Sequence, residues 1–446
     1  MIDLNRIGKK VIEFLKEPLI YIVIICVLMQ IFLYSTVAPH TVTPDGTTYM
    51  RASEAVAEGS VDAARTPVYP IFINVAKTLF GQDNIYDNIV FMQKIVFVMA
   101  IVLFYYSIKE ITKNKIMLIV FTIIFGISPY IIFWNTTILT ETLSVFEAVL
   151  LGLLTLKYIK KPTRIKTVSI WGTIFLMVMT RPSFIYVVPI FILFWALRFI
   201  ANKEEFKQNI TATISCAVCV LLILGYCSVM KKTHGEFGIT SISYVNQIVS
   251  AVDSKSYKNG DNEEIILKID EVVGERKEQK ASWDALNRLK EEYSDDEIKE
   301  FASNSIKNSK RHYIRYLVNK TIYVGYLDMG ISYVEHKDYV LTDYQNINNY
   351  NYVGHMTMPI NFATLYIFMA ISIIYLIYNL FKNKKINWYI AFFAVMITAN
   401  IFTLIVGAPF EPERLFLASI GYVLLLIIYT IDKINYGGKN NEKTDL

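Results

Sequence analysis

The sequence predicts an all-helical protein that crosses a membrane about ten times. Three observations lead to this prediction. Apolar runs of spanning length recur along a chain of 446 residues that is 54% hydrophobic and 19% charged. Every second junction between these runs contains several lysines or arginines, and the junctions between them do not. The strong charges at the edges of the runs fall on the opposite side from the basic junctions: Asp45, Arg65, Glu141, Arg181, Glu411, Glu413 and Arg414.

The apolar runs are placed in order along the chain by their length. The predicted spans are 18–38, 88–108, 116–134, 138–157, 167–181, 183–199, 210–230, 360–381, 388–408 and 414–432. The fifth is short and is expected to form a tight hairpin with the sixth. The first run lacks a small-residue cleavage site, so we expect it to remain as a signal anchor.

The orientation follows from lysine and arginine in short loops. Basic residues precede the first span and follow the second, fourth, sixth, eighth and last spans. The positive-inside rule therefore places both termini in the cytosol and the acid- and arginine-rich rim outside. The net charge of +5 comes largely from lysines in these short loops, so it does not indicate nucleic-acid binding.

The spans divide the chain into three parts. Residues 1–230 form an N-terminal transmembrane module with a first outer loop at 39–87. Residues 231–359 form a large outer segment with charged helical patterning over 262–310, and residues 360–446 carry the last transmembrane helices. The four cysteines lie inside predicted spans and do not suggest disulfides. The histidines lack ligand spacing, so neither residue type predicts a metal site.

The first outer loop carries the most informative residues. Asp45 follows Pro44 where a helix N-cap belongs, and a short interfacial helix is expected to run from there to Gly59. Two interpretations of Asp45 stay open. It is the helix cap, or it is a general base or a ligand of a divalent ion at the water–lipid boundary. Arg65 is likewise either a snorkelling interfacial cation or a phosphate-binding group.

Other polar residues at this rim also have two interpretations each. Glu141 is a helix N-terminal acid with Thr140 as the cap, or it supports the site or binds a metal. Tyr49 and Tyr69 are expected as membrane-belt residues, with stacking on a sugar as the alternative. Asn135 begins a glycosylation sequon that lies too close to the membrane to be a good acceptor.

Several motifs, in order along the chain, resemble those of one enzyme family. In the first loop they are Asp45-Gly-x-x-Tyr49, Ala52, Gly59, Arg65-x-Pro67-x-Tyr69-Pro70 and Leu79-Phe80-Gly81. Further along they are Ser128-Pro129, Leu139-Thr140-Glu141-Thr142, Thr180-Arg181-Pro182 and Glu411-Pro-Glu413-Arg414. The set resembles the GT-C glycosyltransferases, in the branch of the dolichyl-phosphate-mannose protein mannosyltransferases and the aminoarabinose lipid A transferases. The segment 231–359 resembles no family.

The resemblance implies a membrane enzyme that moves a sugar from a polyprenyl-phosphate carrier to an acceptor on the outer side. Asp45 would be the general base, and a single base with direct displacement would invert the anomeric carbon. A phosphate leaving group calls for cations, and the candidates are Arg65, Arg181 and Arg414. The supporting residues would be Tyr49, Tyr69, Glu141, Glu411 and Glu413.

The resemblance leaves several matters open. The acceptor is a glycan, a lipid or a protein, and a divalent ion (Mg or Mn) is an optional cofactor. The expected location is a bacterial plasma membrane. One alternative function is a glycan polymerase or ligase, in which Arg311 and Arg315 of the outer segment would matter more than Asp45. Another is a glycolipid transporter, which the absence of an internal repeat disfavours.

Overall fold

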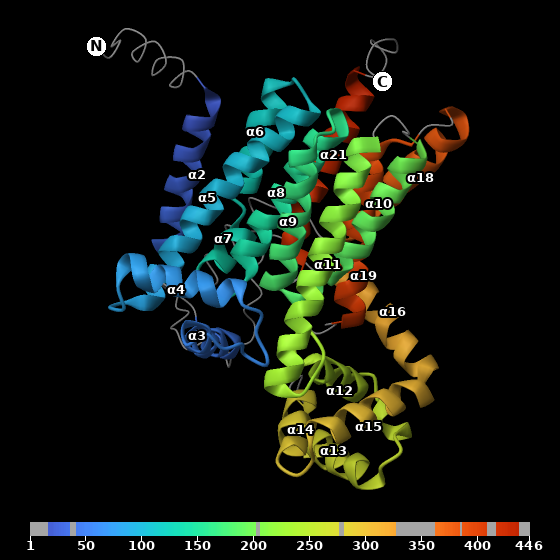
Figure 1. The fold of residues 1–446 in the computed structure, drawn as a ribbon. Coiled ribbons are helices and arrows are strands. Elements are labelled where there is room, and N and C mark those ends of the chain that lie inside the picture. The colour runs from blue at the N-terminus through green and yellow to red at the C-terminus, as the bar shows by residue number, and fades with distance from the viewer. Residues whose placement is uncertain are drawn as a thin grey trace.

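The computed structural model describes residues 17–35, 42–201, 206–275, 281–326, 362–383, 386–407 and 416–436, and the regular elements within these ranges are helices. Long apolar helices run side by side as a bundle (Figure 1). The bundle is made of α2 (Pro18–Ser35), α5 (Ile85–Ile111), α6 (Lys115–Gly126), α7 (Pro129–Asn135), α8 (Glu141–Lys160), α9 (Arg164–Thr180), η1 (Pro182–Tyr186), α10 (Val187–Ala201), α11 (Phe206–His234), α18 (Phe362–Asn383), α19 (Trp388–Gly407), η5 (Leu417–Ser419) and α21 (Ile420–Tyr436).

The helical, membrane-like fold class is confirmed, and each predicted span overlaps a helix of the bundle. Among the described residues, 5 helices are long and apolar enough to cross a membrane, or 6 if one bent pair counts as a single span. The larger number of spans therefore stays a prediction. The buried side chains of these helices form one continuous hydrophobic core.

The predicted span 116–134 is broken into two helices in the structure. The chain forms α6 and α7, which are bent by 44°. The break falls at Ser128, whose ψ of 113° is extended rather than helical. Pro129 causes this, because a proline disfavours the helical conformation of the residue before it and favours the first position of a new helix.

Small residues allow close packing inside the bundle. A Cβ built on Gly126 of α6 would lie 2.4 Å from the sulfur of Cys26 in α2. On α8, a Cβ at Gly152 would lie 3.0 Å from the ring of Tyr422, whose hydroxyl donates to the Ala148 carbonyl at 2.7 Å. The glycines therefore let α2 and α21 approach their neighbours more closely than a side chain would permit.

Two short helices lie across one end of the bundle (Figure 1). They are α3 (Pro44–Ala57) and α4 (Val68–Phe80). The α3 helix has two faces: Tyr49, Ala52 and Ser53 are buried, whereas Arg51 and Glu54 are exposed. It ends where expected, at Gly59, which adopts a φ of 78° that favours glycine. In Figure 1, α2 begins and α21 ends at the opposite end of the bundle.

The large outer segment contains a separate group of helices beside the same end of the bundle (Figure 1). These helices have their own hydrophobic core, which includes Ile248, Ile269, Leu289 and Phe301. The helical patterning expected over 262–310 is confirmed. The group consists of α12 (Ser243–Asp253), η3 (Ser256–Asn259), α13 (Glu263–Glu275), α14 (Ala281–Lys290) and α15 (Asp295–Asn308), and α16 (Lys310–Tyr326) leads from it to the bundle.

Candidate active site

Asp45 is not the N-cap of α3, so that interpretation is wrong. The cap is Thr43, whose hydroxyl accepts a hydrogen bond from the Gly46 amide at 3.1 Å. Pro44 takes the first helical position, which suits a residue without an N–H. Asp45 is therefore the second residue of the helix, where the helix dipole favours a carboxylate but no capping bond requires it.

Asp45 instead forms an ion pair with Arg65. The distance from Asp45 Oδ1 to the Arg65 guanidinium is 2.6 Å, and the side chains are 37% and 14% exposed. The Nε of Arg65 donates to Thr48 Oγ1 at 2.7 Å, and its Cζ lies 4.5 Å from the centre of the Tyr49 ring. One arginine from the loop thus binds three side chains of the first turns of α3.

Asp62 holds the backbone that carries Arg65. Its Oδ1 accepts hydrogen bonds from the amides of Ala64 and Arg65, at 2.8 and 2.9 Å. This local turn aims the arginine at α3. Asp62 thus fixes the backbone conformation next to Arg65.

Tyr49 and Tyr69 are not membrane-belt residues. Both are buried, and their rings meet edge to face at 4.9 Å. The Tyr69 hydroxyl donates to Gln93 Oε1 at 2.7 Å, while Gln93 Nε2 donates to the carbonyls of Asn135 and Thr137, each at 2.9 Å. Burial, the charge of Glu141 and the Tyr49 hydroxyl raise the pKa of Tyr69 well above its usual value, so it remains a neutral donor.

Gly46 brings α3 against the segment that precedes α8. A Cβ at Gly46 would lie 3.0 Å from the carbonyl oxygen of Ile138, so the contact leaves little room for any other side chain. The sequon at Asn135 lies in this same segment and is buried together with Thr137. A buried asparagine cannot serve as a glycan acceptor in the folded chain, as the sequence had suggested from its closeness to the membrane.

A second carboxylate–arginine pair lies at the start of α8. Glu141 is 1% exposed, and its Oε1 lies 3.3 Å from the guanidinium of Arg181. Thr140 is the N-cap residue by position but its side chain makes no capping bond, so that expectation is wrong. Arg181 follows α9 directly and precedes Pro182, which begins η1. The family-like Thr180-Arg181-Pro182 junction therefore places its arginine on Glu141.

The two pairs are connected through the residues beside their arginines. The hydroxyl of Thr66, next to Arg65, donates to the carbonyl of Thr180 at 3.1 Å. Thr180, next to Arg181, donates its hydroxyl to Glu147 Oε1 at 2.6 Å. The structure thus brings together Asp45, Arg65, Glu141 and Arg181 from segments that are far apart in the sequence.

Sequence reasoning missed the residues that make these connections. Glu147 is a carboxylate inside a predicted span, and the charge pattern that placed every strong charge at the rim overlooked it. A buried acid in an apolar helix was the available signal. Gln93 and Thr66 carry no such signal because they are uncharged, and Thr180 was noted only as part of the Thr180-Arg181-Pro182 motif, without a role of its own.

Three residues of the predicted site lie outside the described ranges: Glu411, Glu413 and Arg414. Within those ranges, no three His, Cys, Asp or Glu side chains gather in a way that could hold a metal ion. The carboxylates that the site does contain, Asp45 and Glu141, face arginines, which disfavour a cation at the same place. The described residues thus do not fit a divalent ion.

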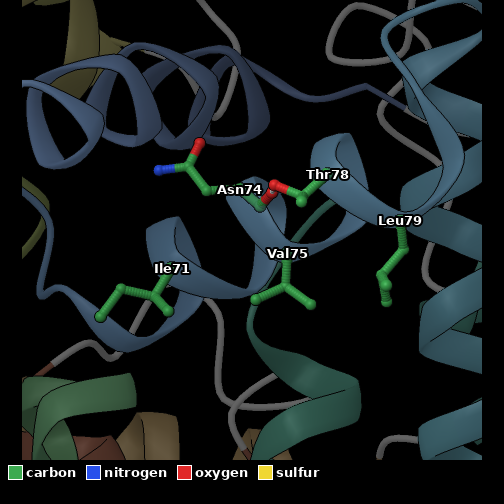
Figure 2. Close-up of a pocket in the computed structure, with 5 residues that line it drawn as sticks. All are labelled: Ile71, Asn74, Val75, Thr78 and Leu79. Atoms are coloured by element: carbon green, nitrogen blue, oxygen red, sulfur yellow. Dashed lines mark hydrogen bonds between the residues drawn. The ribbon is translucent and has the colours of Figure 1, made fainter.

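A hollow on the surface of α4 lies outside the two ion pairs (Figure 2). It is lined by Ile71, Asn74, Val75, Thr78 and Leu79. In Figure 2, Asn74 points toward α3, where it donates to the Ser53 carbonyl at 2.7 Å, and Val75 points away from α3. The lining has no ionisable side chain, so this hollow has none of the chemistry of the candidate site.

Comparison with known proteins supports the fold. No protein-family model matches the chain, and no curated protein sequence matches it. Archaeal oligosaccharyltransferase AglB from Archaeoglobus fulgidus, solved with an inhibitory peptide and a dolichol-phosphate, matches with a TM-score of 0.50 and 12% identity, over 97% of this chain and 53% of that one. The Archaeoglobus fulgidus oligosaccharyltransferase solved with Zn and sulfate matches with a TM-score of 0.50 and 14% identity, over 93% and 50%.

These similarities show the fold. This chain thus shares its fold with these oligosaccharyltransferase structures. The narrower branch suggested by the motifs, that of the protein mannosyltransferases and aminoarabinose transferases, is not confirmed. This chain spans about half the length of the oligosaccharyltransferase structures it matches.

Proposed function

We propose that this protein is a membrane glycosyltransferase that moves a sugar from a polyprenyl-phosphate donor to a hydroxyl of an acceptor on the extracytoplasmic side. The observation that carries the proposal is the pair of carboxylate–arginine contacts, Asp45–Arg65 and Glu141–Arg181, brought together at one end of a GT-C-like bundle. The acceptor is a glycan, a lipid or a protein.

Each charged group has a role in this reaction. Asp45 takes the proton from the acceptor hydroxyl as the new bond to the anomeric carbon forms. The bond from that carbon to the phosphate oxygen breaks, and the sugar is transferred with inversion. The polyprenyl phosphate leaves with its charge stabilised by Arg65 and Arg181, with Arg414 as a further candidate. The buried Tyr49 ring lies against the Arg65 guanidinium and is backed by Tyr69, while Glu411 and Glu413 position Arg414.

The Asp45–Arg65 ion pair gives this proposal an order of events. A carboxylate held at 2.6 Å by a guanidinium is a poor proton acceptor. The phosphate of an incoming donor competes for the same guanidinium, while Thr48 and Tyr49 keep Arg65 in place. Donor binding would thereby release Asp45 to act as the base, so the donor should bind before the acceptor reacts.

The lipid carrier determines where the site must lie. A polyprenyl chain stays in the bilayer while its sugar phosphate reaches the boundary with water, and α3 and α4 lie across the end of the bundle (Figure 1). Lysines in the last turns of α5, α8 and α21 mark the other end. By the positive-inside rule that end is cytosolic, which agrees with a plasma-membrane protein of about ten spans with both termini in the cytosol.

A divalent ion is not needed for any step above. Magnesium and manganese prefer oxygen ligands, and Asp45 and Glu141 each have one carboxylate oxygen paired with an arginine, whose positive charge opposes a cation. The metal question is tested with a chelator. Turnover that survives EDTA supports the arginine-based reaction. Turnover that is lost and returns with Mg or Mn would show that the reaction uses a cation.

The central test is release of free polyprenyl phosphate by purified protein in lipid. A panel of polyprenyl-phosphate sugars is supplied together with acceptor-containing membranes, and the wild type is compared with Asp45→Asn. Glu58→Gln is the matched control, because it removes an exposed carboxylate from the other end of α3. We expect turnover of one donor by the wild type and the control, and at least a 100-fold loss in Asp45→Asn. A correctly folded wild type that turns over no donor would refute the proposal.

The same assay separates the alternative functions. In a polymerase or ligase, Arg315→Ala would cost more activity than Asp45→Asn. Arg311 and Arg315 lie on the exposed side of α16, apart from the two ion pairs. Movement of glycolipid across the membrane without turnover would instead indicate a transporter.

A further inference from the structure

The two arginines that are candidates for phosphate binding are linked by a buried chain of hydrogen bonds. Thr66 donates to the Thr180 carbonyl at 3.1 Å, and Thr180 donates to Glu147 at 2.6 Å. All three residues are buried. Thr66 follows Arg65 in the sequence, and Thr180 precedes Arg181. The chain therefore joins the backbone segments that carry the two guanidinium groups.

The Thr66 bond uses a carbonyl that the helix leaves open. Thr180 is the last residue of α9, and Arg181 is extended with a φ of −149°. The amide that would continue the helix onto Thr180 belongs to Phe184, and it donates to the Arg181 carbonyl instead. The last carbonyls of a helix need partners from elsewhere, and Thr66 supplies one. This hydrogen bond joins the first loop to the end of α9.

Glu147 also binds the end of α9, through the side chain of Thr180. It lies on α8, which also carries Glu141, so one helix contacts both Thr180 and Arg181. Its second oxygen, Oε2, is buried and has no hydrogen-bond partner among the described residues. An acid inside an apolar helix is costly and tends to be kept only where it has a function. Because the local packing offers Oε2 no partner, helix stability alone does not explain this acid.

We propose that Thr66, Thr180 and Glu147 are positioning residues that hold Arg65 and Arg181 at a fixed separation for the donor phosphate. The three side chains do not contact the substrate. They make the first loop and the α9–η1 junction act as one unit, so both guanidinium groups meet the phosphate together. This inference rests on the proposed function for its ligand, and the coupling of the two segments can be measured without turnover.

The first test measures hydrogen exchange in residues 60–67 and 181–186 of the full protein in lipid nanodiscs. Thr66→Val removes the linking hydroxyl at nearly constant volume, and Thr66→Ser keeps it. Since a net hydrogen bond contributes on the order of 1 kcal/mol, we expect roughly fivefold faster exchange in Thr66→Val. The increase should occur in both segments, including 181–186 on the far side of the bond. Thr66→Ser should stay close to the wild type.

Glu147 is tested in the same way from the α8 side. Glu147→Leu removes the acceptor of the Thr180 hydroxyl, whereas Glu147→Gln retains one. We expect Glu147→Leu to raise exchange in 60–67 and Glu147→Gln to leave it near the wild-type value. Thr155→Val is the matched control, because Thr155 is a buried threonine of α8 whose hydroxyl donates within its own helix, to the Leu151 carbonyl. It should leave both segments unchanged.

The second test measures binding of polyprenyl phosphate to the same variants, with inorganic phosphate as a separate ligand. Thr66→Val and Glu147→Leu should weaken polyprenyl phosphate binding roughly fivefold, and Thr66→Ser and Glu147→Gln should restore it. If Thr66→Val changes exchange in 60–67 but not in 181–186, and Glu147→Leu leaves 60–67 unchanged, the inferred coupling is wrong. If both segments loosen and the affinity stays at the wild-type value, the positioning role is wrong. A wild type that binds no polyprenyl phosphate counts against the proposed function, while the exchange result still decides the coupling.

Discussion

The carboxylate of Asp45 and the guanidinium of Arg65 lie 2.6 Å apart, although 20 positions separate them in the sequence. Between them the chain forms α3, turns at Gly59 and is aimed back by Asp62. The loop therefore folds so that its two motif charges meet at the first turn of α3. This arrangement, rather than either residue alone, is the basis for the predictions about the site.

Arg65→Lys should weaken donor use. The arginine donates to Asp45 and Thr48 at once, whereas a lysine is a point charge that cannot reproduce this geometry. We expect the KM for the donor to rise about tenfold, with a smaller change in the KM for the acceptor. The measurement is release of polyprenyl phosphate as a function of donor concentration. Arg164→Lys, at an exposed position in the first turn of α9, is the control, and equal donor KM values for the two variants would contradict the assignment.

Tyr69→Phe should destabilise the protein although it removes a single oxygen. The change leaves the buried Gln93 Oε1 without its 2.7 Å donor, and a buried polar atom that loses its partner costs about 1–3 kcal/mol. A lower apparent melting temperature in nanodiscs would show this cost. The double variant Tyr69→Phe/Gln93→Leu removes the unpaired oxygen but also removes the donor to the carbonyls of Asn135 and Thr137. The double variant should therefore remain unstable, and a full recovery would argue against the network.

Gly46→Ala should displace α3 from the segment before α8. Its Cβ would lie 3.0 Å from the Ile138 carbonyl, and neither backbone can yield without moving the Asp45 turn. We expect lower transfer activity and a lower melting temperature. Gly172→Ala provides the comparison, since nothing lies within 4 Å of its Cβ position and alanine favours a helix interior by roughly 0.5–1 kcal/mol. It should be neutral or stabilising, and similar losses in both variants would show that the contact at Gly46 is unimportant.

Glu141 and Arg181 should behave as a coupled pair. Removing one partner of a buried ion pair leaves an uncompensated charge, which costs about 3–5 kcal/mol, whereas removing both relieves that cost. A double-mutant cycle with Glu141→Ala and Arg181→Ala, read as thermal stability, should therefore show a double variant less unstable than the sum of the single ones. Strict additivity would mean that the 3.3 Å contact contributes no coupling.

The outer helices should unfold without loss of donor binding. Phe301 is buried in their separate core, and a buried phenylalanine changed to alanine costs about 3–5 kcal/mol. Phe301→Ala should make residues 243–309 sensitive to limited proteolysis while polyprenyl phosphate still binds. Phe237→Ala, at an exposed position, should resist cleavage like the wild type. Loss of donor binding together with the outer core would show that the two parts do not fold separately.

The sequence was a good guide wherever one helix decides the outcome. The two faces of α3, its end at Gly59 and the helical nature of 262–310 follow from local periodicity and glycine conformation. The sequence was a poor guide where adjacent residues compete for one position at a helix end. Thr43 took the cap expected of Asp45 because Pro44 occupies the first helical position, and Pro129 broke a run that looked continuous by hydropathy.

The tyrosines show a second kind of failure. Tyr49 and Tyr69 were expected at the membrane surface because tyrosine is common there. In the structure Gln93 provides a buried acceptor for Tyr69, whose ring packs on Tyr49, and Arg65 lies over the Tyr49 ring. Whether an amphipathic residue faces lipid or the core depends on a partner from another helix, and spacing along the chain does not reveal it.

By itself the sequence determined the apolar helices, the basic end of the bundle and the identity of most charged residues of the candidate site, because hydropathy, charge and turn-forming residues are local properties. The tertiary structure decided which charges meet. Asp45 faces Arg65, Glu141 faces Arg181, and Thr66, Thr180 and Glu147 join them, through contacts between segments as much as 114 positions apart. Such contacts depend on how whole helices pack, and that packing is the sum of many small contributions that no short motif records.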